Sequence, residues 1–273
     1  MSRLNNTFTT LQKRNEKAFI PYITLGDPSP EFSLKLIRKL QENGADIIEL
    51  GIPFSDPIAD GPTIQAASVR ALKAGMTTDL AFKLIKEIRN TLEIPLVFLT
   101  YYNIIFQRGV QRFFIDCSEV GIDGVIIPDL PIEEATQALE AANANNVDII
   151  FTIAPTTATN RLNKILEYAK GFLYLVGLLG TTGARMSLST MTKTTLERIQ
   201  PLTKDRIPVS VGFGISRPEH VKELNRAEAD GIIVGSAIID ILARNLTEED
   251  IALEKISEFA ATMKAMTLPN AVT

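Results

Sequence analysis

The sequence predicts an α/β protein whose eight strands alternate with helices and close into a single (β/α)8 barrel. Three observations carry this prediction. Short β-branched apolar runs recur along the chain, amphipathic stretches lie between them, and the length of 273 residues is typical of one such barrel. Each run is bounded by Gly, Pro or Asp, which favours strands over helices. Strands that alternate with helices imply right-handed βαβ units and a parallel sheet.

The candidate elements follow in order along the chain. The strands cover residues 19–24, 46–50, 96–100, 124–127, 148–153, 172–176, 208–211 and 231–234. Two apolar stripes at helical spacing are Phe32, Leu36, Ile37 and Leu40, and Phe82, Ile85 and Ile88. Residues 1–14 are expected to form an extra N-terminal helix, and residues 248–266 a final helix packed on the outside.

An open, doubly wound sheet is the alternative architecture. In such a sheet a Gly-x-Gly-x-x-Gly turn follows the first strand and opens a helix. Residues 26–30 instead read Gly-Asp-Pro-Ser-Pro. No linker, low-complexity tract or strong shift in composition interrupts the chain. Residues 1–273 are therefore expected to form one domain.

Composition argues against several classes of function. The 28 basic and 32 acidic side chains give a net charge of −4, whereas nucleic-acid binding usually goes with a basic patch or a high pI. No apolar run is long enough to span a bilayer, and the first residues lack the apolar core of a signal peptide. Cys117 is the only cysteine, which fits a reducing compartment. We expect a cytoplasmic protein with no nucleic-acid or membrane partner.

A carboxylate ends the second predicted strand. Side chains alternate along a strand, so Glu49 shares a face with Ile47, and Ile48 shares the other with Leu50. If Glu49 points into the barrel mouth, burial raises the pKa of its carboxyl group. Such a pKa suits a group that both donates and accepts a proton near neutral pH. The alternative is a glutamate at a strand edge that reaches solvent.

The loop that follows, residues 51–65, is long for a connection between a strand and a helix. Three prolines stiffen it, and it carries two further carboxylates, Asp56 and Asp60. Asp60 precedes Gly61 and Pro62, where the next helix is expected to begin. The alternative to a functional role is that Asp60 is simply the N-cap of that helix. Asp56 could equally form an ordinary Asp-Pro turn.

The last two predicted strands both end in glycine. Barrels often bind phosphate with the loops after strands 7 and 8 and with the N-terminus of a short helix. Here strand 7 leads into residues 212–216, which include Gly214, and strand 8 leads into Gly235 and Ser236. Backbone N–H groups there and the Ser236 hydroxyl can donate to an anion. The sequence thus predicts a barrel of the phosphate-binding type, unless the glycines only make tight turns.

Two residues of reactive types are expected to be structural. His220 is the only histidine and follows a probable helix start, where we expect it to be a solvated helix residue. A single histidine also argues against a Ser-His-Asp hydrolase and against a histidine-based metal site. Cys117 lies on an amphipathic stretch and is expected to pack in the core.

The end of the second strand and the loop after it, residues 49–65, read ELGIPFSDPIADGPTIQ. This segment resembles the signature of the tryptophan synthase alpha chain family. Further segments fall in the order and spacing of that family: PYITLGDPSPEFSLKLI at 21–37, PDLPIEEA at 128–135, GTTGAR at 180–185, VGFGIS at 211–216 and VGSAII at 234–239. The similarity extends over nearly the whole chain and implies the TIM-barrel fold.

The resemblance implies a lyase reaction, the retro-aldol cleavage of indole-3-glycerol phosphate to indole and glyceraldehyde 3-phosphate in tryptophan biosynthesis. Glu49 would be the general acid and base, and Asp60 would accept a hydrogen bond from the indole N–H. No cofactor is expected in this chain. Indole would pass through a tunnel to a beta chain that carries pyridoxal phosphate, in an alpha2-beta2 heterotetramer.

The resemblance also implies residues that bind the substrate. Gly183 would complete the phosphate cradle, and the Thr182 hydroxyl would meet Asp60 when the loop after the sixth strand closes. That loop, about residues 178–190, is expected to be mobile without ligand. The indole pocket must be apolar and flat, and its candidates near strand ends are Phe19, Tyr22, Leu99, Tyr101, Ile127, Ile153, Tyr174 and Phe213. Each of these could equally be ordinary core.

The chain departs from the family at one place, since Gly177 stands where the family commonly has serine. Two other functions stay open on the sequence. One is a different phosphorylated-sugar barrel enzyme, against which the segment from Glu49 to Asp60 argues. The other is a non-catalytic subunit that only binds and activates a beta chain. Such an activator would have no need for both Glu49 and Asp60.

Overall fold

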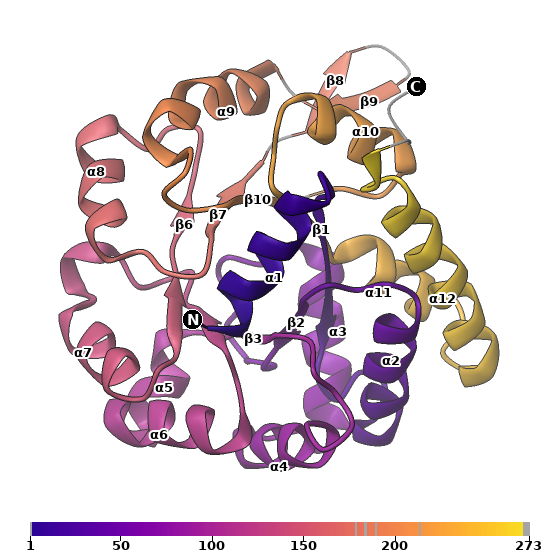
Figure 1. The fold of residues 1–273 in the computed structure, drawn as a ribbon. Coiled ribbons are helices and arrows are strands. Elements are labelled where there is room, and N and C mark those ends of the chain that lie inside the picture. Colours follow the sequence, from indigo (N-terminus) through magenta and orange to yellow (C-terminus); the bar gives the residue numbers. More distant parts are fainter. Residues whose placement is uncertain (1, 178, 183–184, 189, 213, 270–273) are drawn as a thin grey trace.

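Parallel pairing joins nine strands into one sheet that curls into a barrel (Figure 1). The structure is a computed structural model that describes residues 2–177, 179–182, 185–188, 190–212 and 214–269, with the backbone alone for 179–182 and 185–188. The order of strands in the sheet is β5-β4-β3-β2-β1-β11-β10-β7-β6. The strands are β1 (Ala18–Thr24), β2 (Ile48–Gly51), β3 (Leu96–Leu99), β4 (Gly124–Ile126), β5 (Asp148–Ile150), β6 (Thr152–Ile153), β7 (Leu173–Val176), β10 (Val209–Gly212) and β11 (Gly231–Val234).

The fifth predicted strand closes the ring, but it is not one strand. Residues 148–153 divide into β5, which pairs with β4, and β6, which pairs with β7. Between them, the Phe151 carbonyl accepts the N–H of Tyr174 at 3.0 Å. Strands in a barrel are tilted and staggered, so one run can meet its two neighbours along different halves. The prediction of a single strand was wrong for this reason, while the closed (β/α)8 architecture is confirmed.

Helices cover the outside of the barrel (Figure 1). They are α2 (Pro30–Glu42), α3 (Pro62–Lys73), α4 (Thr78–Ile88), α5 (Tyr102–Arg108), α6 (Val110–Val120), the short 3-10 helix η1 (Ile132–Glu134), α7 (Thr136–Ala144), α8 (Thr159–Tyr168), α9 (Thr190–Thr203), α10 (Pro218–Arg226), α11 (Ser236–Ala243) and α12 (Glu249–Ala265). The predicted final helix corresponds to α12. Among the described residues, no helix combines the length and apolarity that crossing a membrane requires.

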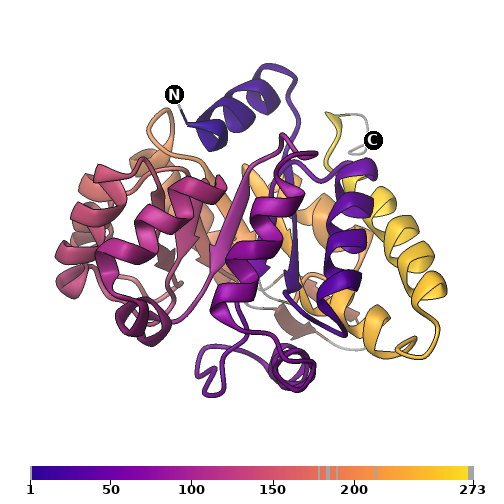
Figure 2. The ribbon, with the colours of Figure 1, turned by 90° about the horizontal axis from the view of Figure 1, so that it is seen from below.

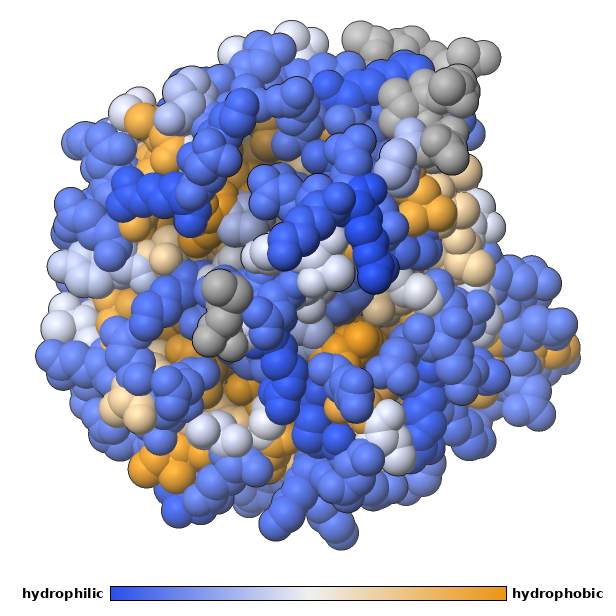
Figure 3. All heavy atoms as spheres, in the orientation of Figure 1, coloured by the Kyte–Doolittle hydropathy of each residue, from blue (hydrophilic) through white to orange (hydrophobic). Residues whose placement is uncertain are grey.

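The predicted N-terminal helix, α1 (Arg3–Lys13), lies across one end of the barrel (Figure 2). Leu4 and Phe8 belong to the same buried cluster as the inward side chains of the strands, and the rings of Phe8 and Phe172 lie 5.6 Å apart. The face with α1 is covered mostly by hydrophilic residues (Figure 3). The N-terminal end of the barrel is therefore plugged, and the opposite end carries the loops that leave the strands.

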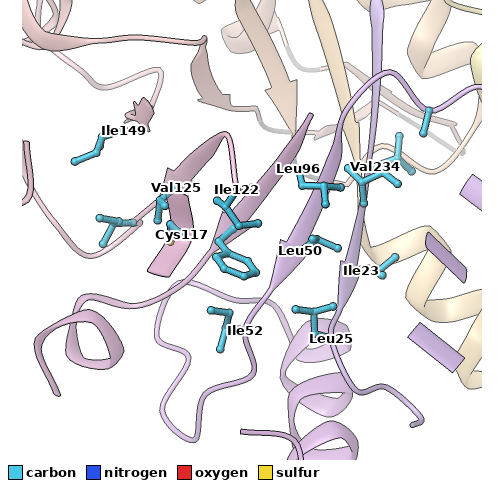
Figure 4. Packing of buried hydrophobic residues seen from close by; sticks show 14 of the residues in the cluster. Ile23, Leu25, Leu50, Ile52, Leu96, Cys117, Ile122, Val125, Ile149 and Val234 are labelled. Atoms are coloured by element: carbon cyan, nitrogen blue, oxygen red, sulfur yellow. The ribbon is translucent and has the colours of Figure 1, made fainter. Parts of the chain in front are cut away.

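Alternation along the strands divides the core into two layers. Ile20, Ile47 and Val97 point inward and pack with α1, whereas Leu50 and Ile23 point outward against the helices (Figure 4). Both predicted helical stripes are buried in the outer layer. Because Ile48 and Leu50 face the helices, Glu49 between them must face the barrel interior.

Aspartates one or two residues before three of the strands tie neighbouring strands together at the N-terminal end. The carboxylates of Asp46, Asp123 and Asp230 accept the backbone N–H groups of Phe19, Leu96 and Val209, at 2.8, 2.9 and 2.9 Å. The Asp123 carboxylate also accepts from Arg3 of α1 and from Arg89 at the end of α4. These contacts fix the register of the strands at the end away from the loops.

One element was not expected from the sequence. Within the loop after β7, β8 (Leu179–Thr182) and β9 (Arg185–Leu188) form an antiparallel two-stranded sheet. In Figure 1 this hairpin lies beside α10. The apolar periodicity that reveals core strands is absent from residues 178–190, so no local pattern predicts this hairpin. The mobility expected of this loop stays a prediction.

Asp123→Ala should lower the free energy of unfolding by about 3 kcal/mol, because it leaves the buried Leu96 N–H without its acceptor and the Arg89 guanidinium without its charged partner. Asp79→Ala is the matched control, because Asp79 also pairs with an arginine but its side chain is 86% exposed. It should cost less than about 1 kcal/mol. Urea unfolding measures both; equal effects would contradict this account of the barrel's N-terminal end.

Candidate active site

Glu49 lies in the mouth of the barrel with its side chain 1% exposed. Its Cα partners are Tyr22 on β1 and Val97 on β3. Among the described residues, its Oε2 atom is buried and has no hydrogen-bond partner. Burial, followed by the nearby charge of Asp60, raises the pKa of the Glu49 carboxyl to about 8. Glu49 is therefore protonated at neutral pH, as the sequence argument expects for an inward-facing glutamate.

Asp60 lies at the end of the loop that leaves β2, and it is half-buried. Burial raises the pKa of its carboxyl group to about 6, against the opposing effect of a hydrogen bond from Tyr101. The Asp60 side chain does not cap α3. That helix has Gly61 as its N-cap residue, with no side-chain hydrogen bond. Asp60 is instead directed to the barrel mouth, so the two carboxyl groups differ in protonation at neutral pH.

Tyr101 holds the segment that carries Asp60. Its hydroxyl oxygen accepts the Ala59 N–H at 3.0 Å, and its proton is donated to the Asp60 carboxylate. Its ring stacks on Phe54 of the same loop, with centroids 5.3 Å apart. Since Tyr101 is buried and directly precedes α5, the loop from β2 is anchored on the end of β3. A single hydroxyl thus orients both the backbone and the carboxylate.

Two tyrosines lie close to Glu49: Tyr22, which is buried, and Tyr174, which is partly buried. Both Tyr22 and Tyr174 have their pKa raised by burial and by the charges of Glu49 and Asp60. Glycines make room for them, because a Cβ atom on Gly51 would collide with the Tyr22 hydroxyl and one on Gly212 with the Tyr174 hydroxyl. The Tyr22 hydroxyl also lies 3.2 Å from Thr24 Oγ1. Both tyrosine side chains therefore lie against glycines of the neighbouring strands, Tyr22 against β2 and Tyr174 against β10.

The glycine-rich turns after β10 and β11 are neighbours, because those two strands pair. Gly214 has a φ of +74°, a conformation that favours glycine. Gly235 is the N-cap of α11 and lacks a side-chain hydrogen bond there. A Cβ atom on Gly235 would lie 3.1 Å from the Tyr22 ring. Ser236 opens the helix, so its first N–H groups are directed to the mouth without a side-chain cap.

The remaining predicted residues fall in three places. Leu99 contacts the inner layer, whereas Phe19, Ile127 and Ile153 pack in the outer layer between strands and helices. Thr182 belongs to β8, and its side chain lies outside the described residues, as do Gly183 and Phe213. Their roles stay predictions. Among the described residues, no group of three His, Cys, Asp or Glu side chains is placed to hold a metal ion.

Comparison with known proteins agrees with this geometry. The sequence profile of the tryptophan synthase alpha chain matches residues 8–268. The chain is 48% identical over 248 residues to the tryptophan synthase alpha chain of Methanothermobacter thermautotrophicus, covering 91% of each. It superposes on tryptophan synthase subunit alpha of Legionella pneumophila with a TM-score of 0.90 at 34% identity, covering 98% of each chain.

The chain belongs to the tryptophan synthase alpha chain family. A third match is to a chain of the tryptophan synthase a2b2 complex of Pyrococcus furiosus, at 39% identity and a TM-score of 0.85, covering 92% of this chain and 99% of that one. The resemblance drawn from residues 49–65 is thus confirmed, and so is the fold it implied.

Family membership does not explain every buried polar residue. The expectation that His220 is solvated was wrong, because its side chain lies in the core side of α10 and the residue is 1% exposed. Cys117 is buried as predicted. Sequence reasoning listed Tyr101 only as a pocket residue and missed its bond to the loop. The signal available was its position, directly after the third predicted strand, where barrel side chains meet the neighbouring loop.

Proposed function

We propose that this chain is the carbon–carbon lyase subunit of tryptophan synthase, which cleaves indole-3-glycerol phosphate to indole and glyceraldehyde 3-phosphate. One observation carries the proposal: the buried Oε2 atom of Glu49 has no hydrogen-bond partner among the described residues, and the carboxyl group lies within the electrostatic reach of Asp60. Burying a carboxyl group without a partner is costly. A substrate that offers a proton acceptor and a hydroxyl would supply the missing partner.

Glu49 performs both proton transfers in this mechanism. With a pKa of about 8 it is protonated at neutral pH and donates its proton to C3 of the indole ring. The resulting carboxylate takes the proton of the glycerol hydroxyl next to the ring. As the O–H bond is lost, the aldehyde forms, the carbon–carbon bond breaks, and its electron pair returns to the indole ring. Glu49 ends the cycle protonated, as it began.

Asp60 stabilises the ring while it is positively charged. With a pKa of about 6 its carboxyl group is ionised at neutral pH. It accepts a hydrogen bond from the indole N–H, where positive charge develops when C3 is protonated. Tyr101 keeps that carboxylate in place. Two carboxyl groups in one mouth thus take opposite roles because their environments separate their pKa values.

The phosphate group of the substrate lies at the glycine-rich turns in this proposal. Backbone N–H groups near Gly214 and Gly235 and the hydroxyl of Ser236 donate to it, as at other helix N-termini. Gly183 completes this cradle from the loop after β7, and the Thr182 hydroxyl meets Asp60 when that loop closes. The indole ring occupies the mouth lined by Tyr22, Tyr101, Tyr174 and Phe213. Ile127 packs in the outer layer and therefore does not contact the ring.

A non-catalytic activator of a beta chain is the second candidate. An activator needs the outer surface of the loops and not a buried acid. The position of Glu49 therefore favours the lyase, and family membership favours this lyase over another phosphorylated-sugar barrel.

Glu49→Gln should reduce the rate of indole release by about 10² to 10⁴-fold, because the amide cannot transfer a proton. Asp60→Asn should also be severely impaired, because the charge opposite the indole nitrogen is lost. Glu42→Gln, on the exposed face of α2, is the control and should keep the wild-type rate. Indole formation from indole-3-glycerol phosphate is measured with each purified chain. A Glu49→Gln rate within about threefold of wild type would contradict the assignment of Glu49 as the general acid and base.

We also propose that the chain works with a beta chain in an alpha2-beta2 heterotetramer. The family includes the a2b2 complex of Pyrococcus furiosus. The cleavage step uses no cofactor in this chain, and pyridoxal phosphate belongs to the beta chain. The assembly is cytoplasmic, and residues 1–273 act as one barrel domain.

The loops at the barrel mouth offer the docking surface, because released indole must leave from that end. The loop with Pro53 and Asp56 also carries Ile58, whose side chain is 82% exposed. Phe106 on α5, which follows the neighbouring strand β3, is 61% exposed. Exposed apolar side chains at such a position are typical of a protein interface.

Ile58→Asp should weaken the complex with the cognate beta chain by about tenfold or more, because a buried apolar anchor becomes a desolvated charge. Ile251→Asp is the control: Ile251 is also an exposed isoleucine, at 39%, but it lies on α12 at the outside of the barrel. Titration calorimetry with the beta chain compares the two. Equal affinities would remove Ile58 from the interface, and no complex with the wild-type chain would refute the partnership.

A further inference from the structure

The only histidine of the chain is buried at the start of α10. His220 is 1% exposed and lies in the first turn of the helix, three residues after the N-cap Arg217. Burying an imidazole is unfavourable unless its nitrogen atoms are hydrogen-bonded. Neither of the proton transfers at Glu49 involves it. A structural or positioning role must therefore explain why a titratable ring occupies this place.

One hydrogen bond of His220 is with the turn that precedes the helix. The N–H of Ser216 donates to His220 Nδ1 at 3.3 Å. Because Nδ1 accepts, the ring is neutral and carries its proton on Nε2. The side chain of the N-cap residue, Arg217, does not cap the helix with a hydrogen bond. His220 thus reaches back from the third helical position, as glutamate does in a capping box, and binds the N–H of the residue before the cap.

Ser216 is the exit of the turn that contains Gly214. On its entry side the turn is fixed, because β10 pairs with both β7 and β11. On its exit side, Ile215 is 2% exposed and packs in the outer layer, and the backbone of Ser216 is held by the imidazole. With φ at +74°, Gly214 lies between two anchored ends. The direction of the backbone N–H groups of the turn depends on both anchors.

The helix that His220 belongs to also meets the hairpin after β7. α10 packs against β9, and Glu223 of α10 pairs with Lys193 of α9 at 3.6 Å. One helix therefore supports both the turn after β10 and the hairpin whose loop was expected to close over the substrate. A shift of the N-terminus of α10 would move both.

We propose that His220 is a positioning residue of the phosphate site: its neutral imidazole accepts the Ser216 N–H and holds the turn at Gly214 in the conformation that receives a phosphate monoester. The inference rests on the proposed function, since it deepens the phosphate site assigned there. It concerns binding of the phosphate and not the proton transfers at Glu49. Its signature is therefore a change in KM with little change in kcat.

Two variants distinguish the effect of the hydrogen-bond acceptor from the effect of the shape of the ring. His220→Phe keeps the shape of the ring but has no acceptor, whereas in His220→Asn the side-chain oxygen takes about the place of Nδ1. For His220→Phe, the KM for indole-3-glycerol phosphate and the Kd for glycerol 3-phosphate should both rise about three- to tenfold, which is the usual effect of one hydrogen bond. His220→Asn should stay within about twofold of wild type, and kcat should change little in either.

Val221→Ala is the matched control, because Val221 is a buried neighbour on the same helix. It should lower thermal stability and leave the Kd for glycerol 3-phosphate unchanged. If His220→Phe behaves like Val221→Ala, His220 is only a core residue and the proposal is overturned. Failure of His220→Asn to restore the affinity would overturn it equally.

A measurement on the wild-type chain covers the case in which His220→Phe does not fold. Nitrogen-15 spectra of the imidazole should show the proton on Nε2, with slow hydrogen exchange at the Ser216 amide; a proton on Nδ1 would contradict the proposal. Glycerol 3-phosphate keeps this test separate from the proposed reaction. A chain that binds it but releases no indole would refute the lyase function and leave the positioning role standing. No binding by the wild type would overturn the phosphate site and His220's role together.

Discussion

The burial of the Glu49 carboxyl group beside Asp60 is the constraint on which the other features of the mouth depend. A carboxyl group that is 1% exposed, with one oxygen that has no hydrogen-bond partner in the described part of the chain, stays neutral, and the charge of Asp60 adds to the effect of burial. Asp60 remains a stronger acid because it is only half-buried and because Tyr101 donates to it. The difference between the pKa of Glu49, about 8, and that of Asp60, about 6, therefore results from the positions of the two groups and not from their residue types.

The barrel divides its polar groups between its two ends. At the N-terminal end, Asp46, Asp123 and Asp230 accept strand N–H groups and α1 plugs the interior, so these three carboxylates are hydrogen-bonded within the protein. At the opposite end, Glu49 Oε2 lacks a partner among the described residues, and α11 begins without a side-chain cap. The same strands thus carry stabilising contacts at their N-terminal ends and the candidate active site at their C-terminal ends.

The sequence predicted the parts of the structure that follow from periodicity. The alternation of Ile48, Glu49 and Leu50 was enough to predict that the carboxylate points inward. The order of strands and helices was enough to predict the barrel. Other features depend on contacts far apart in sequence. The division of residues 148–153 is set by the separate pairing of its halves with β4 and β7, and no local pattern encodes that.

Site residues showed the same limit. The bond between Tyr101 and the loop joins positions 101 and 59, and the buried place of His220 depends on how α10 packs. A helical pattern around His220 could not tell a buried face from a solvated one, because the residue itself is compatible with both. The reactive carboxylates at strand ends could therefore be predicted from the sequence. The residues that hold the loops in place around them could not.

The direct test of this account is the titration of Glu49 itself, followed by carbon-13 NMR of the side-chain carboxyl group in the wild type and in Asp60→Asn. The account predicts a pKa of about 8 in the wild type, and a lower value in Asp60→Asn that stays above 4.5 because burial remains. A wild-type pKa near 4.5 would contradict it, because Glu49 would then be ionised at neutral pH and could not begin the reaction as an acid.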